Sequence, residues 1–140
     1  MAVGASATTV RATGVYRRMQ RESRAAGACP LELVSMLYDE LETSLGVMAA
    51  MIRHGQRISA TDPAIRARNI LIGLDANLDR STGGDVADAL SRVYRSMRRK
   101  LDDAVQHNSE AMLAELLEGV KTVSDAWRQL REQQPRGAAA

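Results

Sequence analysis

The chain has 140 residues, of which 45% are hydrophobic and 26% charged, a composition typical of one globular domain and unlike that of a disordered protein. Aromatic residues make up only 3% and phenylalanine is absent, so the core must consist mainly of aliphatic side chains and methionine, which suits packed helices better than a β-sandwich. The single cysteine, Cys29, excludes an internal disulfide and gives no support to an oxidising compartment.

The formal net charge of +2 is unevenly distributed along the chain. Residues 1–29 carry five arginines and one glutamate, a net charge of +4, so the remainder carries −2. A basic arm can contact nucleic acid or an anionic surface, but no basic face continues it in the body, which favours a solvated arm. No run of about 18 apolar residues and no apolar signal segment occurs, so we expect a cytoplasmic protein without membrane insertion.

The N-terminal part is expected to end in a small apolar group. Residues 1–13 are rich in alanine, threonine, serine and glycine, which predicts a disordered tail. Residues 14–23 can form a short helix that contains Tyr16 and Met19. Tyr16 is interpreted either as a plug that packs into a groove or as an ordinary surface tyrosine.

The first long helix is expected to begin at Pro30, because proline needs no amide partner at the first helical position. It can run to about His54, with Gly55 as a left-handed cap. Apolar residues spaced one turn apart predict the buried face of this helix, namely Leu33, Leu37, Leu41 and Leu45.

The second helix is expected from Asp62 as N-cap and Pro63 at the first position to about Asp79. Its stripe has alternating three- and four-residue spacing and consists of Ala64, Ala67, Leu71, Leu74 and Leu78. Three isoleucines widen the apolar surface beyond what one core needs, namely Ile65, Ile70 and Ile72.

A tight turn is expected at residues 81–84, followed by a third helix from Asp85 to His107. Asn108 and Ser109 are expected to cap a fourth helix that ends near Gln133. Four long amphipathic helices with short connections predict an all-α, antiparallel up-down four-helix bundle with a short extra N-terminal helix or arm. The single bundle domain is expected over residues 14–133, and residues 134–140 are expected to form a flexible tail.

Catalytic, cofactor and metal sites are not expected. Both histidines, His54 and His107, fall near helix C-termini, where a capping role suits them. Neither belongs to a Glu-x-x-His pattern, and no glycine-rich phosphate loop follows a strand. We therefore expect a binding protein that is not an enzyme and that needs no cofactor.

The surplus apolar surface has two interpretations. Either both faces of the first two helices are core, or one of them forms a groove for a partner helix. Methionine occurs 7 times, and its flexible side chain adapts to more than one partner shape. Composition and periodicity alone favour the core.

Four segments in order resemble the FliS family of flagellar secretion chaperones. They are Pro30-Leu31-Glu32-Leu33-Val34-Ser35-Met36-Leu37-Tyr38-Asp39, Ala67-Arg68-Asn69-Ile70-Leu71-Ile72-Gly73-Leu74 continuing to Leu78-Asp79, Gly83-Gly84-Asp85 with Leu90 and Val93-Tyr94, and Asp125-Ala126-Trp127. The resemblance covers about residues 14–131, and Tyr16 is placed like the tyrosine that often precedes the family's first helix. The chain departs from the family at Cys29, before the proline, and at Glu40, where the family usually has glycine.

The resemblance implies a chaperone that binds the disordered C-terminal segment of flagellin in apolar grooves, prevents premature polymerisation and delivers it to the export gate of the flagellar type III apparatus. Helices that are apolar on two sides supply the expected partner-binding residues, namely Ile65, Ile70, Ile72, Leu90, Tyr94 and Met97. Tyr16 and Met19 are expected on an arm that occupies the groove in the absence of flagellin. Leu33, Leu37, Leu71 and Leu78 are expected in the core, and Trp127 is expected to close one end of the bundle.

Two other functions compete with this expectation. The surplus apolar face can form a homodimer, in which case the free protein is a weak dimer rather than a monomer. The basic arm can bind nucleic acid, although the acidic body disfavours it. Whether an anti-sigma factor or a co-chaperone shares the surface is left open by the sequence.

Overall fold

The computed structural model describes residues 15–16 and 30–133, apart from the side chains of residues 30, 31, 82 and 131. The expected N-terminal tail, most of the short helix at residues 14–23, Met19 and the C-terminal tail lie outside the described residues. Four long helices are present, namely α3 (Pro30–Arg53), α4 (Asp62–Ala76), α5 (Arg80–His107) and α6 (Glu110–Gln133).

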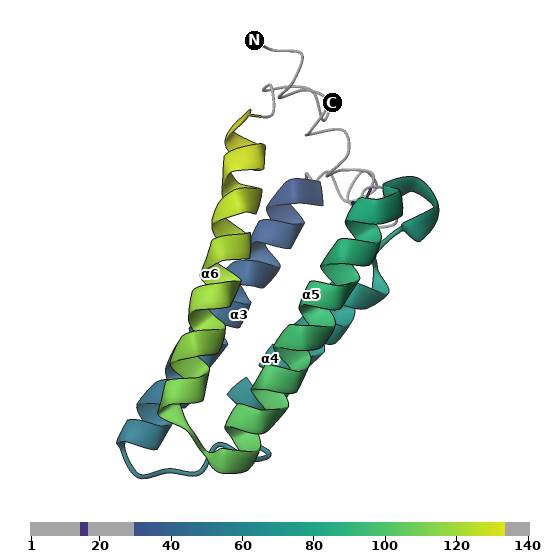
Figure 1. Ribbon diagram of the computed structural model, residues 1–140. Helices are drawn as coiled ribbons and strands as arrows, with labels where there is room; N and C mark the ends of the chain where they lie inside the picture. Colours follow the sequence, from purple (N-terminus) through teal and green to yellow (C-terminus); the bar gives the residue numbers. More distant parts are fainter. Residues whose placement is uncertain (1–14, 17–29, 134–140) are drawn as a thin grey trace.

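The helices form an antiparallel up-down bundle (Figure 1). Each helix packs against the next along the chain, and α6 closes the ring by packing against α3. Consequently α4 and α6 lie diagonally opposite each other, with α3 and α5 between them. No strand occurs among the described residues, and the predicted all-α bundle is confirmed.

The connection between α3 and α4 corrects one expected cap. Gly55 has φ +77°, so it is the left-handed residue predicted after the first helix. The N-cap of α4 is Thr61 in extended geometry, and Asp62 is already helical. α4 then ends at Ala76, three residues before the predicted end, and the side-chain amide of the C-cap Asn77 donates to the Gly73 carbonyl at 2.8 Å.

The predicted turn at residues 81–84 is also corrected. The chain is already helical from Arg80, and the break is confined to Gly84, whose φ of 53° and ψ of −128° lie outside the helical region. Only glycine adopts such backbone angles without steric cost. The helix expected to begin at Asp85 is therefore the main part of a longer element that is kinked at Gly84.

Asn108 and Ser109 join α5 to α6. Asn108 has φ 48° and takes the left-handed position after α5. The Ser109 hydroxyl accepts a hydrogen bond of 3.1 Å from the Met112 amide, so the predicted cap of the fourth helix is confirmed at Ser109.

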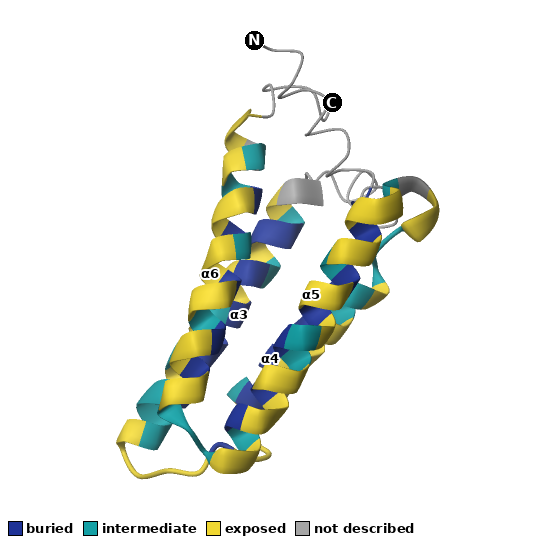
Figure 2. Cartoon of the chain, in the orientation of Figure 1, coloured by how far each residue is buried: buried dark blue, intermediate teal, exposed yellow. Residues whose placement is uncertain are grey.

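Buried residues lie on the sides of the helices that face the other helices, and exposed residues lie on the outer sides (Figure 2). The core contains the expected aliphatic residues, with Leu71 fully buried, while the predicted core residues Leu33, Leu37 and Leu78 are half-buried. It also contains all four aromatic side chains of the chain, three tyrosines and one tryptophan. Within the described residues, no helix is both long and apolar enough to cross a lipid bilayer.

Candidate partner-binding site

A short N-terminal segment is docked on the bundle at the connection between α4 and α5. The Val15 carbonyl accepts a hydrogen bond of 2.6 Å from the Asp79 amide. A Cβ at Gly83 would lie 3.2 Å from the Cα of Val15 and 3.0 Å from the Cβ of Ala87. The missing side chain of Gly83 is therefore what lets the Val15 backbone approach this closely.

Tyr16 extends from this segment into the bundle and is only 1% exposed. Its hydroxyl lies 2.7 Å from that of Tyr94 on α5, which also hydrogen-bonds the hydroxyl of Tyr38 on α3. The ring of Tyr16 packs at 5.6 Å between centroids against Trp127 of α6. We call these four residues the aromatic cluster; through it, one N-terminal side chain contacts or bridges three of the four helices.

The hydroxyls of the cluster remain protonated at neutral pH. Burial raises the pKa of Tyr16, Tyr38 and Tyr94 well above the usual value, because removal from water disfavours the phenolate. The neighbouring tyrosines act in the same direction through charge repulsion. Each hydroxyl is thus a neutral donor and acceptor, which the hydrogen-bond chain requires.

A polar network fixes α4 against α5 near the aromatic cluster. The Ser91 hydroxyl donates to Asp75 Oδ1 at 2.7 Å and accepts from Arg80 Nη2 at 2.9 Å. Arg95 and Arg98 approach the other carboxylate oxygen of Asp75 at 3.7 and 3.8 Å. The largely buried Asp75 side chain is therefore compensated by a hydrogen bond and two cations.

The outer face of α4 carries exposed apolar side chains. Ile65 is 49% and Ile72 is 38% exposed, and Asn69 lies exposed between them. Ile65 lines two grooves, one of about 540 Å³ against α3 and one of about 260 Å³ against α5. We call this surface the α4 face.

Ion pairs form the edges of the α4 face. Arg66 Nε lies 3.4 Å from Glu40 Oε1 on α3, and Arg68 pairs with Asp102 on α5. Glu40 therefore bridges to α4 at the edge of the larger groove. All four side chains are largely exposed, so these pairs add little stability and leave the apolar strip accessible.

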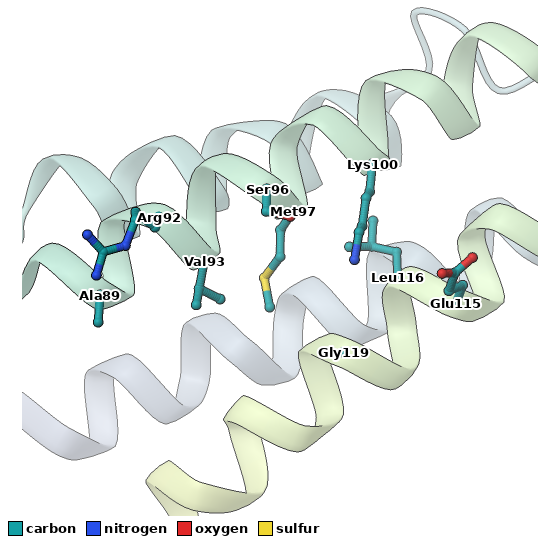
Figure 3. A pocket seen from close by; sticks show the side chains of 9 residues that line it. All are labelled: Ala89, Arg92, Val93, Ser96, Met97, Lys100, Glu115, Leu116 and Gly119. Carbon is teal, nitrogen blue, oxygen red and sulfur yellow. The ribbon is translucent and has the colours of Figure 1, made fainter. Parts of the chain in front are cut away.

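A further groove of about 420 Å³ lies between α5 and α6 on another side of the bundle. Figure 3 shows Ala89, Val93 and Met97 extending from one side of α5, with Gly119 on α6 across the groove. We call it the α5–α6 groove.

The predicted binding residues that the structure describes differ widely in burial. Ile65 and Ile72 are exposed, while Leu90 is half-buried and lies against the core. Four others are buried, namely Tyr16, Ile70, Tyr94 and Met97. Ile70 and Met97 nevertheless contribute to groove walls, on the α4 face and in the α5–α6 groove respectively.

Tyr38 and Trp127 belong to the same site as Tyr16, although sequence reasoning did not place Tyr38 there. The available signal was the scarcity of aromatic residues, since the chain has only three tyrosines and one tryptophan among 140 residues. No group of three potential metal-ligating side chains occurs in the part of the chain that the structure describes. The arrangement therefore offers apolar docking surfaces and a buried hydrogen-bond chain.

A family model described as "Flagellar protein FliS" matches residues 12–134, which include all four helices. The chain belongs to the FliS family. "Flagellar secretion chaperone FliS" of Salmonella typhimurium is 30% identical over 116 residues, which are 82% of this chain and 86% of that protein. The proteins of the same name from Vibrio cholerae and Bacillus subtilis are 26% and 30% identical, over 82% and 73% of this chain and 85% and 75% of their own lengths. Membership of this family supports a role as a flagellar export chaperone.

Proposed function

We propose that this FliS-family chain binds the disordered C-terminal segment of flagellin in the cytosol, prevents its premature polymerisation and delivers it to the flagellar export gate. The chain acts by binding alone, without catalysis or a cofactor. The observation that carries this proposal is the α4 face, where the exposed Ile65 separates two grooves on a protein of this family.

The geometry of the α4 face suits a helical occupant. Ile65 and Ile72 are seven residues apart, so they lie on one side of α4 about two turns from each other. An amphipathic helix presents its own apolar residues at the same spacing and can place them in the grooves on either side of Ile65. Asn69 between the two isoleucines favours a polar residue opposite it and so helps to set the register.

The docked Tyr16 supports the proposed role of the N-terminal arm. Tyr16 belongs to a short segment outside the four helices. This segment is held by the hydrogen bond between Tyr16 and Tyr94, the ring contact between Tyr16 and Trp127, and the hydrogen bond that the Val15 carbonyl accepts. When the arm leaves, Tyr94 and Trp127 are uncovered, and an apolar side chain of the bound segment can take the place of Tyr16. In the free protein the arm therefore protects a surface that would otherwise face water.

Folding on binding explains why the interface must be large. A disordered segment loses conformational entropy when it becomes ordered, which lowers the affinity obtained per unit of buried area. The α4 face and the place of Tyr16 together provide two separated docking regions along one bound segment. No nucleotide is needed for release, because transfer to the export gate can replace one set of apolar contacts with another.

Calorimetry with a synthetic flagellin C-terminal peptide tests the proposal. The full chain should bind one peptide with a negative heat-capacity change, measured at two temperatures, because apolar surface is buried. The double variant Ile65→Ser/Ile72→Ser should bind at least about tenfold more weakly, since hot-spot side chains contribute more than 1 kcal/mol each. Val47→Ser is the matched control, because Val47 is 45% exposed on α3 and lines none of the three grooves described.

Two results would contradict the proposal. Equal affinities of the double variant and the control would remove the α4 face from the interface. Absence of peptide binding, together with a concentration-dependent dimer in sedimentation that Ile65→Ser/Ile72→Ser dissociates, would instead make the α4 face a self-interface.

A further inference from the structure

The α5–α6 groove is separated from the α4 face by α5. Apolar side chains form its floor, namely Val93, Met97 and Leu116. Val93 is 37% exposed, and Val86 on the same side of α5 is 43% exposed. These residues are seven positions apart, so the apolar strip continues along α5 beyond the groove itself.

The α6 side of the groove lacks a side chain where one would fit. A Cβ at Gly119 would meet nothing within 4 Å, so packing within the chain does not require glycine there. Glycine inside a helix is less stable than alanine at the same position. Gly119 therefore makes α6 less stable than alanine would, but it leaves room in the groove for the backbone of a partner to approach closely.

The charges at the groove favour an acidic occupant. Arg92 and Lys100 lie at the α5 side, both exposed, and make no ion pair with any residue that the structure describes. They are eight residues apart, which is about 12 Å along a helix. Residues 89–101 of α5 contain five cations and no acidic residue, whereas Glu115 is the charged residue on the α6 side of the groove.

We propose that the α5–α6 groove is the docking surface for a second partner, an amphipathic helix whose apolar face packs on Val93, Met97 and Leu116 and whose acidic edge faces Arg92 and Lys100. This partner differs from the segment on the α4 face. Because α4 and α6 are diagonal in the bundle, one chain can hold both occupants at once. Acidic residues about two turns apart on the partner pair with the two cations, and the apolar floor provides most of the affinity.

Fluorescence anisotropy with two matched peptides tests the proposal. Both are labelled 18-residue amphipathic helices with the same leucine face and glutamine along one edge; the other edge carries glutamate in the first and lysine in the second. The full chain should bind the glutamate peptide about fivefold more tightly or better, because only its glutamates can form charge pairs with Arg92 and Lys100. Arg92→Glu/Lys100→Glu should reverse this preference.

Gly119→Met provides the variant that fills the groove. Its side chain enters open space, so α6 should be at least as stable, and binding of the glutamate peptide should fall at least about tenfold because the apolar floor is covered. Gly73→Met is the matched control, because a Cβ at Gly73 also meets nothing within 4 Å and Gly73 lines a groove of the α4 face. Gly73→Met should weaken binding of the flagellin peptide and leave the affinity for the glutamate peptide unchanged.

Four results would overturn the proposal. The first is no binding of the glutamate peptide, and the second is equal binding by the Gly119→Met chain. The third is competition between the flagellin and glutamate peptides, with Gly119→Met weakening both, which would assign the groove to the flagellin interface. The fourth is a dimer of the free chain that Gly119→Met dissociates, which would make the occupant a second copy. If the flagellin peptide does not bind but the glutamate peptide does, the proposed function fails and the proposal for the α5–α6 groove stands.

Discussion

The aromatic cluster and the α4 face are both apolar, but one is closed and the other is open. In the cluster, Tyr16 covers Tyr94 and Trp127 and satisfies a buried hydroxyl. On the α4 face, Ile65 and Ile72 remain exposed beside two unfilled grooves. The difference indicates that changes in the cluster should act mainly on stability, whereas changes on the α4 face should act mainly on binding.

Trp127→Ala should have the largest effect on stability. Trp127 is 5% exposed and packs against Tyr16, so its loss creates a cavity and should lower the free energy of unfolding by about 3–5 kcal/mol. Ile72→Ala, at a 38% exposed site, should cost less than about 1 kcal/mol. Urea denaturation followed by circular dichroism measures both losses. Similar losses for the two variants would contradict the expected difference between the aromatic cluster and the α4 face.

Tyr16→Ala should change stability and binding in opposite directions. The variant loses a buried ring and one hydrogen bond, so its free energy of unfolding should fall by about 2–4 kcal/mol. The flagellin peptide should bind up to about tenfold more tightly, because the arm no longer has to leave first. Weaker peptide binding would mean that Tyr16 contacts the bound segment directly and does not compete with it.

Gly83→Ala tests the docking of the N-terminal segment without touching an aromatic ring. The new Cβ would lie 3.2 Å from the backbone of Val15, so the segment must shift, at a cost of about 1–2 kcal/mol. Gly46→Ala in α3 meets nothing within 4 Å and should stabilise by up to about 1 kcal/mol. In thermal unfolding, the midpoint temperature should fall for Gly83→Ala and rise for Gly46→Ala. A higher midpoint for both variants would show that the N-terminal segment can shift without cost.

Alkaline pH tests the hydroxyls of the aromatic cluster without any substitution. The pKa values of the three tyrosines are raised by burial, so the folded chain keeps its protons while the unfolded chain ionises at about pH 10. Stability contributed by the cluster is therefore complete below about pH 10 and decreases as pH rises further. Urea midpoints at pH 8 and pH 11 measure this loss, which should be smaller in Tyr16→Phe; an equal loss would exclude Tyr16 as a contributor.

The helices were predictable because their signals are local. Pro30, Gly55 and Ser109 mark helix boundaries through backbone chemistry that acts within a few residues. Periodicity revealed the surplus apolar surface of α4 but favoured the core for it, whereas Ile65 and Ile72 are exposed. One N-cap was assigned a residue too late, at Asp62 instead of Thr61, because both residues are good N-caps.

The aromatic cluster was only partly predictable because its contacts are distant in sequence. The hydrogen bond between Tyr16 and Tyr94 joins residues 78 positions apart, and that between Tyr38 and Tyr94 joins residues 56 apart. Periodicity places each tyrosine on a face of its own helix but cannot say which faces meet. The same limit applies to the α5–α6 groove, where Gly119 becomes informative only once Val93 and Met97 lie across from it.

Asn108 ties the two helix connections at the far end of the bundle together. Its side-chain carbonyl accepts a hydrogen bond of 2.9 Å from the Ile58 amide, and its side-chain amide donates at 3.1 Å to the Gln56 carbonyl. The aromatic cluster lies toward the opposite end, where α3 and α5 begin and α6 ends (Figure 1). Asn108 therefore cross-links both connections at the end of the bundle away from Tyr16, so the two ends are held by different chemistry: side-chain to backbone hydrogen bonds at one and aromatic packing at the other.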